Sequence, residues 1–328
     1  MDVFKSIPVL VFLLFCILSD ATAEGQGEDG WQGRQQAVMG SSSLGSSWYP
    51  TAARISSVCM KYSDTVIAVQ ASGGGSDNIY LMKGKKIDMG IVESNVMTYS
   101  YQGTGRFKGN PYPGMRFVTT LYPIVYQPVV HKNSGINSIY ALKGKTFSPV
   151  TEDFSEDGAW QEILETAFNF RKSDIIWKPV PGEQRGAAFR DMVIDALGFE
   201  SSSPSGSVLE TAAQSAISLL PIGGTERNKL QQKFWWYKPW TIVSGTYPGQ
   251  AENVETVAID CVIVADRGVN DKIVYDLVRT LYGKDLDMIR SVHQMSSYIM
   301  LENALSGAGP VPLHPGAEKY YREKGLIR

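Results

Sequence analysis

Short apolar segments alternate with amphipathic segments along most of this chain, and stretches rich in glycine and serine separate them. The pattern predicts strands and helices in turn, first over residues 37–92 and again over residues 146–214. Because strand–helix–strand units pair their strands in parallel, with helices over both faces of the sheet, we expect an α/β fold. With 328 residues, the chain is long enough for two domains of about 150 residues each.

The expected elements fall into two units. In the first unit, strands are expected at 37–39, 66–70 and 87–92, and helices at 51–62 and 76–83. In the second unit, strands are expected at 146–148, 175–179 and 193–197, and helices at 158–170, 183–192 and 205–214. Long apolar segments at 117–130 and 253–265 join the units, and helices at 270–282 and near the end complete the chain. We therefore expect two lobes with a ligand cleft between them, lobe 1 being 37–123 with 255–328 and lobe 2 being 124–254.

Residues 1–23 have the pattern of a secretory signal peptide, with an apolar run over 7–18 and a small-residue cleavage site at Ala21-Thr22-Ala23. The apolar run is shorter than the roughly 20 residues that cross a bilayer as a helix, so a permanent anchor is the weaker alternative. Cys16 lies inside the run, which disfavours a lipid-acceptor cysteine. Residues 24–36 are polar and rich in glycine, and we expect a flexible lead-in there. An exported, periplasmic protein is the expectation.

Charge and cysteine content exclude several classes of protein. Lys and Arg number 31 against 33 Asp and Glu, a net charge of -2 without a basic stretch, so nucleic acid is not an expected partner. No cysteine or histidine pair has zinc-ligand spacing, and no phosphate-loop motif occurs, so we expect neither a metal nor a cofactor. We expect Cys59 and Cys261 as buried free thiols, with a disulfide between them as the alternative in an exported protein.

Three turns at the ends of the first three expected strands carry candidate ligand-binding residues: Gly40–Pro50, Ala71–Asn78 and Val92–Asn95. Small residues let backbone N–H groups approach a ligand, a helix start offers the positive end of its dipole, and serine hydroxyls add donors, an arrangement suited to a carboxylate. A solvated turn is the alternative for each segment taken alone. The candidates are Ser41, Ser42, Ser43, Trp48, Tyr49, Ser72, Gly74, Gly75, Asn78, Glu93, Ser94 and Asn95.

These turns, together with Leu121-Tyr122-Pro123, Leu142-Lys143-Gly144-Lys145 and the tail Val311–Tyr321, resemble the TAXI family. That family comprises the extracytoplasmic solute-binding proteins of tripartite ATP-independent periplasmic (TRAP) transporters. The resemblance runs in order through residues 37–328. It implies a two-lobed periplasmic binding protein fold, type II-like, that closes on a small carboxylate such as an amino acid, dicarboxylate or keto acid. It also implies delivery to a TRAP-type membrane permease, and a second-lobe ligand segment that contains Ser201 and Ser202.

The turn at residues 151–158 departs from that family's pattern, because it holds four carboxylates where the family has a small-residue turn. Carboxylates that pointed inward would repel an anionic ligand. They either face solvent or recognise an amino group of the ligand, and Asp153 and Ser155 are candidates on the second interpretation. The turn also begins like a calcium loop, but Leu164 stands where that loop has its bidentate glutamate, which disfavours calcium.

No enzyme is expected from this sequence. His131, His293 and His314 lie far apart, and no GxSxG motif occurs, so nucleophilic catalysis has no visible machinery. A secreted hydrolase is the weaker alternative, and a binding module that presents its loaded form to a membrane sensor is the other. The expected mechanism is closure of the lobes about hinge segments at 121–130 and 243–257.

Overall fold

The computed structural model describes residues 35–149, 158–180 and 182–328. They belong to one compact unit, Gln35–Arg328. The predicted signal peptide and nearly all of the predicted lead-in lie outside the described residues. The lead-in was expected to reach residue 36, but Gln35 and Gln36 already belong to the first strand.

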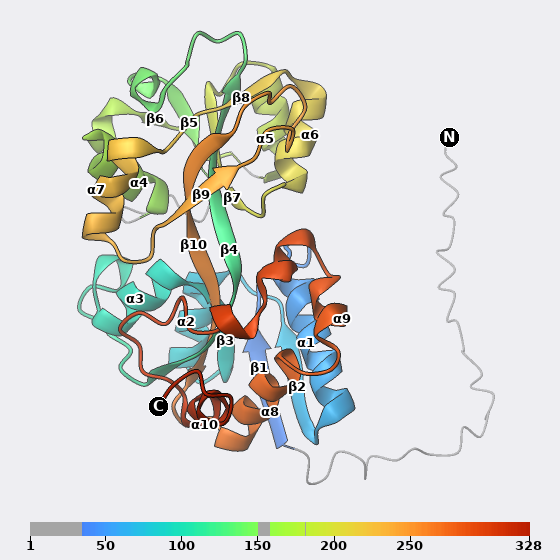
Figure 1. Cartoon of the computed structure of the whole chain (residues 1–328). Helices are drawn as coiled ribbons and strands as arrows, with labels where there is room; N and C mark the ends of the chain where they lie inside the picture. Colours follow the sequence, from blue (N-terminus) through green and yellow to red (C-terminus); the bar gives the residue numbers. More distant parts are fainter. Residues whose placement is uncertain (1–34, 150–157, 181) are drawn as a thin grey trace, which may run out of the picture. The chain divides into compact units, whose positions relative to one another are not determined.

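Lobe 1 is built on a strand–helix–strand–helix–strand unit, as the sequence predicts (Figure 1). Its elements are β1 (Gln35–Gly40), α1 (Trp48–Tyr62), β2 (Thr65–Gln70), α2 (Gly75–Lys83) and β3 (Met89–Glu93). β1 pairs in parallel with both β2 and β3, which places β1 in the middle. α3 (Ser94–Gln102) follows β3 directly and was not predicted, because its polar residues show no clear apolar period. A short 3-10 helix, Gly105–Phe107, leads toward the next strand.

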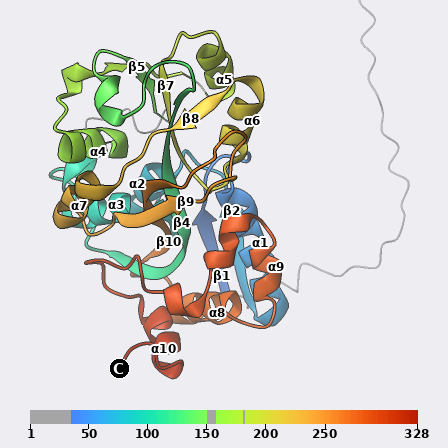
Figure 2. The same cartoon turned by 45° about the horizontal axis from the view of Figure 1, so that its top comes forward.

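Lobe 2 repeats the same order of elements. They are β5 (Thr146–Ser148), α4 (Ala159–Phe168), β6 (Ile176–Trp177), α5 (Gly182–Arg190) and β7 (Ala196–Ser201). β5 pairs in parallel with β6 and β7 and lies in the middle, as β1 does in lobe 1. The chain continues through α6 (Gly206–Gln214), β8 (Ile217–Leu219), α7 (Gly224–Lys233) and β9 (Lys238–Ile242). Figures 1 and 2 show α4 and α7 over one face of this part of the sheet and α5 and α6 over the other.

Two long strands, β4 (Met115–His131) and β10 (Val254–Asp266), join the lobes. They pair antiparallel from Met115–Asp266 to Val125–Ala258, after which β4 continues beside β7 and β10 beside β9. The two apolar runs predicted around Tyr122-Pro123 are therefore one strand. The result is a ten-stranded sheet whose main order is β2-β1-β3-β10-β4-β7-β5-β6.

The C-terminal segment returns to lobe 1. Its helices are α8 (Asp271–Leu281), α9 (Leu286–Arg290) and α10 (Pro315–Glu323). α8 and α10 correspond to the two helices predicted there, and α9 was not predicted. α8 buries an apolar face with helical spacing that includes Ile273, Val274 and Leu277. Cys59 in α1 and Cys261 in β10 are buried free thiols, as predicted. In the described part of the chain, no helix combines the length and apolar character needed to cross a membrane.

Candidate functional site

A cavity of about 750 Å³ lies where residues of both lobes meet the crossing strand β4. Its volume falls within the roughly 300–1,000 Å³ that is usual for small-molecule sites. Lobe 1 contributes the loops that follow β1, β2 and β3, and lobe 2 contributes the start of α4 and the segment between β7 and α6. Residues 122–124 and Tyr126 of β4 complete the lining. The topology explains this arrangement, because the loops after parallel strands gather at one edge of the sheet.

Five helices begin at this cavity. α1, α2 and α3 begin there in lobe 1, and α4 and α6 begin there in lobe 2, since residues at the start of each lie in the lining. The first N–H groups of a helix lack intrahelical partners, and the aligned peptide dipoles give that end about half a positive charge. The cavity is therefore surrounded by backbone groups that favour an anion.

The charged side chains of the lining are mostly acidic. Asp77, Glu93 and Glu200 are carboxylates, and Arg106 is the basic side chain among the described lining residues. The Asp77 carboxylate accepts a hydrogen bond from the Gly73 N–H (2.9 Å), so it is engaged with its own loop. The Arg106 guanidinium donates to Ser76 Oγ (2.8 Å), which holds it beside the start of α2. The helix starts thus favour a negatively charged group of a ligand, and the carboxylate side chains favour a positively charged group.

Nine of the residues predicted for the site line this cavity. They lie in the loops and helix starts of lobe 1, or in the serine segment of lobe 2, residues 201–205 between β7 and α6: Ser42, Ser43, Trp48, Gly74, Gly75, Glu93, Asn95, Ser201 and Ser202. Segments that are more than 100 residues apart in the sequence are thus brought to one cavity. Asp153 and Ser155 lie outside the described residues.

Five other predicted residues do not line the cavity: Ser41, Tyr49, Ser72, Asn78 and Ser94. Asn78 is fully buried, and its Nδ2 donates to the carbonyl oxygens of Ser41 (2.7 Å) and Ile91 (2.8 Å). Ser41 Oγ donates to the Gln70 carbonyl (3.1 Å), so it joins the end of β1 to the end of β2. Ser94 Oγ accepts the N–H of Asp260 (3.3 Å). These polar groups hold the loops in place, a role that residue type alone does not separate from ligand binding.

Several lining residues were not predicted: Tyr80, Arg106, Tyr122, Tyr126, Glu200, Ser205 and Ser207. Burial raises the pKa of Tyr122 far above its ordinary value, so its hydroxyl is neutral. Tyr122 also packs edge-on against His293, with ring centroids 4.5 Å apart. Tyr122-Pro123 was part of a recognised motif but was not assigned to the site, whereas Arg106 lies in the short 3-10 helix Gly105–Phe107, for which the sequence gave no signal.

The aromatic run Phe234–Tyr237 lies at the edge of lobe 2 and reaches lobe 1. Trp236 packs edge-on against Tyr99 of α3, with ring centroids 5.2 Å apart. The Glu162 carboxylate of α4 accepts hydrogen bonds from the Tyr99 hydroxyl and from Trp236 Nε1 (3.2 Å). Through Trp236 the run therefore packs against helices of both lobes, α3 and α4.

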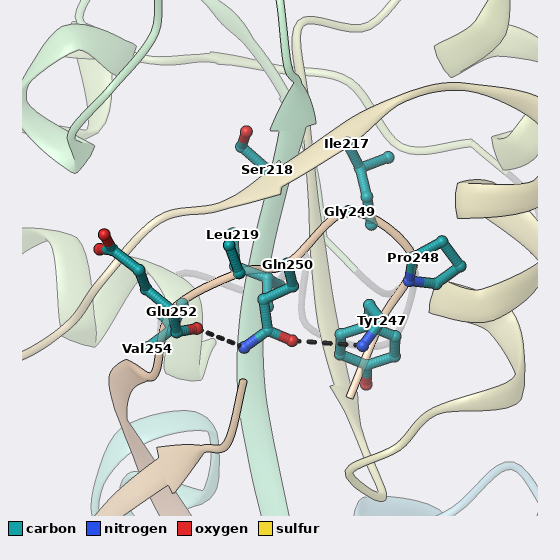
Figure 3. Close-up of a pocket in the computed structure, with 10 residues that line it drawn as sticks. Ile217, Ser218, Leu219, Tyr247, Pro248, Gly249, Gln250, Glu252 and Val254 are labelled. Carbon is teal, nitrogen blue, oxygen red and sulfur yellow. Dashed lines mark hydrogen bonds between the residues drawn. The ribbon is translucent and has the colours of Figure 1, made fainter. Parts of the chain in front are cut away.

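A second, smaller hollow lies in lobe 2, between β8 and the loop 243–253 (Figure 3). Its volume is about 260 Å³, and it shares no described lining residue with the larger cavity. The loop was predicted to form part of a hinge strand. Instead, β10 begins only at Val254, and residues 243–253 form a loop in which Gln250 Nε2 donates a hydrogen bond to the Val243 carbonyl oxygen.

Solved structures that resemble this chain include three binding proteins. The alkanesulfonate-binding protein SsuA from Xanthomonas axonopodis pv. citri, bound to MOPS, has 12% identity and a TM-score of 0.46, with 88% of this chain and 83% of that chain covered. The periplasmic aliphatic sulphonate binding protein SsuA from Escherichia coli has 11% identity and a TM-score of 0.46, with 90% and 94% covered. Lactococcal OpuAC, complexed with glycine betaine, has 11% identity and a TM-score of 0.45, with 89% and 97% covered. Likeness at this level does not bear on the ligand.

A family model matches residues 39–325, which include every described residue that lines the larger cavity. The matched span also takes in both lobes and the two crossing strands. The chain therefore belongs to the NMT1-like family.

Proposed function

We propose that this protein is an extracytoplasmic solute-binding protein that captures a small carboxylate between its lobes. The observation that carries the proposal is the cavity at which five helices begin, three from lobe 1 and two from lobe 2. Each helix start offers N–H groups that have no partner within the helix and carries partial positive charge, and Arg106 adds a full positive charge. A carboxylate is the small anion whose planar pair of oxygens suits such donors.

The acidic side chains of the lining narrow the class of solute. Glu93 and Glu200 place negative charge near the same cavity as the helix starts. A dicarboxylate or a keto acid would meet those carboxylates with like charge, whereas an amino acid could direct its ammonium group toward them. An amino acid, which carries both a carboxylate and an ammonium group, is therefore the first of these three solute classes to test.

Closure of the lobes is the proposed mechanism. We propose that lobe 1 comprises 37–123 with 255–328 and lobe 2 comprises 124–254, because β4 and β10 exchange partners near those boundaries. The final pair between the two strands, Val125 with Ala258, marks the hinge. A small rotation there would bring the serine segment of lobe 2 onto a solute already held by the loops of lobe 1.

The proposed partner is a TRAP-type membrane permease, and the proposed location is the periplasm after removal of the signal peptide. The resemblance of the loop motifs and of the C-terminal tail to the TAXI family supports both. A membrane sensor that recognises the closed form is the alternative partner. A hydrolase is less favoured, because the described lining residues include no histidine or cysteine.

Thermal-shift screening of the full chain against amino acids, dicarboxylates and keto acids tests the proposal. A solute at a hundred times its dissociation constant adds about 2.7 kcal/mol of stability, which corresponds to a rise in melting temperature of roughly 4 °C for a folded unit of this length. Arg106→Gln should lower the affinity for the best acid by about 10-fold, measured by calorimetry. Arg322→Gln, at an exposed ion pair with Glu318 in α10, is the matched control and should leave the affinity unchanged. If no small acid raises the melting temperature, the proposal is wrong.

A further inference from the structure

We propose that Tyr247 and Gln127 are positioning residues for the lobe-2 wall of the cavity. This inference rests on the proposed function, because it concerns how the same cavity holds its solute. The wall is the segment 201–205, which connects β7 to α6. Ser201, Ser202 and Ser205 of this segment line the cavity, whereas Tyr247 and Gln127 do not.

Gln127 connects this wall to the strand that crosses between the lobes. It lies in β4 and is fully buried. Its Nε2 donates hydrogen bonds to Ser201 Oγ (3.1 Å) and to the carbonyl oxygen of Ser202 (2.9 Å). A single amide group therefore fixes one side chain and one peptide group of the wall. The first of these bonds also orients the Ser201 hydroxyl.

Tyr247 fixes the other end of the wall. Its hydroxyl accepts the backbone N–H of Ser205 (2.8 Å) and donates to Gln127 Oε1. Ser205 is the N-cap of α6, and its Oγ accepts the N–H of Val208. Burial raises the pKa of Tyr247 to about 12, so the hydroxyl keeps its proton and remains a donor at neutral pH. The network Gln127–Tyr247–Ser205 thus joins a crossing strand to a helix start at the cavity.

The loop that carries Tyr247 is held by its own hydrogen bonds (Figure 3). Gln250 Oε1 accepts the Tyr247 N–H (3.2 Å), and Gln250 Nε2 donates to the carbonyl oxygens of Ile242 (3.1 Å), Val243 (3.1 Å) and Glu252 (2.9 Å). In Figure 3 the Tyr247 hydroxyl points away from Gln250. The Gln250 side chain therefore holds the backbone of the loop in place. The Tyr247 hydroxyl makes its hydrogen bonds outside the loop, to Ser205 and Gln127.

These contacts have a consequence for binding. A group that binds a solute must be held close to its productive position, and the side chains that hold it matter for affinity even when they do not touch the solute. Without the Tyr247 hydroxyl, the Ser205 N–H loses its acceptor, and Gln127 loses the donor to its Oε1 while its Nε2 keeps the bonds to Ser201 and Ser202. The wall would then sample other positions, and the solute would bind more weakly without any loss of direct contacts.

The experiment compares Tyr247→Phe with Tyr321→Phe in the full chain. Tyr321 is a matched control, because it is fully buried in lobe 1 and its hydroxyl donates to the carbonyl oxygen of Val118 (2.9 Å). Amide hydrogen exchange of residues 201–208 without solute should be about 10-fold faster in Tyr247→Phe than in the wild type, and unchanged in Tyr321→Phe. Equal exchange in Tyr247→Phe and wild type would overturn the inference.

Affinity provides the second readout, with the acid that gives the largest shift in the thermal screen as the probe. Tyr247→Phe should lower its affinity by about 10-fold, and Tyr321→Phe should not change it. Ser201→Ala combined with Tyr247→Phe should lose less than the product of the two single effects, because both act on one wall. Multiplicative losses would overturn the inference. If no acid binds the wild type, the proposed function fails, and the exchange result alone decides whether Tyr247 positions the wall.

Discussion

The two lobes solve the same structural problem with different side chains. In lobe 1, Asn78 of α2 donates to a carbonyl at the end of β1 and to another in β3. In lobe 2, Arg185 of α5 donates through Nη2 to the carbonyl oxygens of Ser148 in β5 (2.8 Å) and Gly198 in β7 (2.7 Å). Each residue is the fourth of its helix. Both therefore bridge the first and third strands of their lobe from the same place.

The two bridges differ in charge. Asn78 is neutral, whereas Arg185 is a guanidinium that is only 7% exposed. Burial lowers the pKa of Arg185 to about 10, against the opposing effect of the Glu200 carboxylate, and the group stays protonated at neutral pH. It lies 4.8 Å from the centroid of the Phe199 ring, a favourable cation–π contact. The topology sets the need for a donor between the strands, but it does not set which side chain supplies it.

The largest expected effect is at the neutral bridge. Asn78→Ala leaves two buried carbonyl groups without their donor, and we expect a loss of about 3 kcal/mol in the free energy of unfolding. Denaturant unfolding of the full chain measures it. Asn137→Ala, at an exposed position, is the matched control and should change stability by less than about 0.5 kcal/mol. A neutral effect of Asn78→Ala would contradict the bridging role.

The charged bridge should be less costly to remove. Arg185→Met keeps most of the side-chain volume and removes a buried charge whose desolvation opposes folding. The two carbonyl groups still lose their donor, so we expect a net loss of about 1–2 kcal/mol, measured by the same denaturant unfolding. A loss equal to or larger than that of Asn78→Ala would show that the guanidinium is not penalised by burial, and the comparison of the lobes would fail.

We expect acid to lower the free energy of unfolding, because two buried histidines of lobe 1 must then take up protons. Burial lowers the pKa of His293 and of His314 below the ordinary value. The unfolded chain therefore binds protons more readily than the folded chain, and stability is lost as pH falls below about 6.5. We expect the melting temperature to fall between pH 7.5 and pH 5.5, because below about pH 6.5 each histidine lowers the free energy of unfolding by up to about 1.4 kcal/mol per pH unit.

His314→Asn tests the acid effect with the helix cap retained, because asparagine can still accept the Gly316 N–H that His314 Nδ1 accepts at the start of α10. The variant should lose less stability than the wild type over the same pH interval. An identical pH dependence in the two proteins would assign the acid sensitivity to other groups.

The smallest expected effect on stability compares two glycines that begin helices at the cavity. A Cβ at Gly75 in lobe 1 would overlap the end of the Glu93 side chain, whereas a Cβ at Gly206 in lobe 2 meets open space. Gly75→Ala should displace Glu93 and lower solute affinity with a stability change within about 1 kcal/mol. Gly206→Ala should stabilise by up to about 0.5–1 kcal/mol and lower affinity less than Gly75→Ala does, because its Cβ displaces no side chain. Thermal unfolding and calorimetry measure both variants. Equal affinities in the two variants would remove Glu93 from the site.

Much of the fold could be predicted from the sequence because its signals are local. The apolar face of α1, the β-branched run of β10 and the glycine turns between strands and helices each depend on residues close together in the chain. The elements that were missed, such as α3 and α7, are polar helices whose stability comes from their neighbours. Some predicted boundaries also differ from the observed ones for this reason. Residues 243–253, for example, form a loop rather than part of a strand, because the Gln250 side chain makes hydrogen bonds there.

The sequence by itself determined the alternation of strands and helices, the α/β class and the small-residue loops that reach the cavity, because periodicity and turn chemistry act over a few residues. Only the tertiary structure decided which polar residues face the cavity and which hold its walls. Ser42 and Ser41 are adjacent serines, yet one lines the cavity and the other bonds a neighbouring strand. Arg106, Tyr247 and Gln127 gave no local signal, since what they do depends on partners that lie far away in the chain and meet only once it is folded.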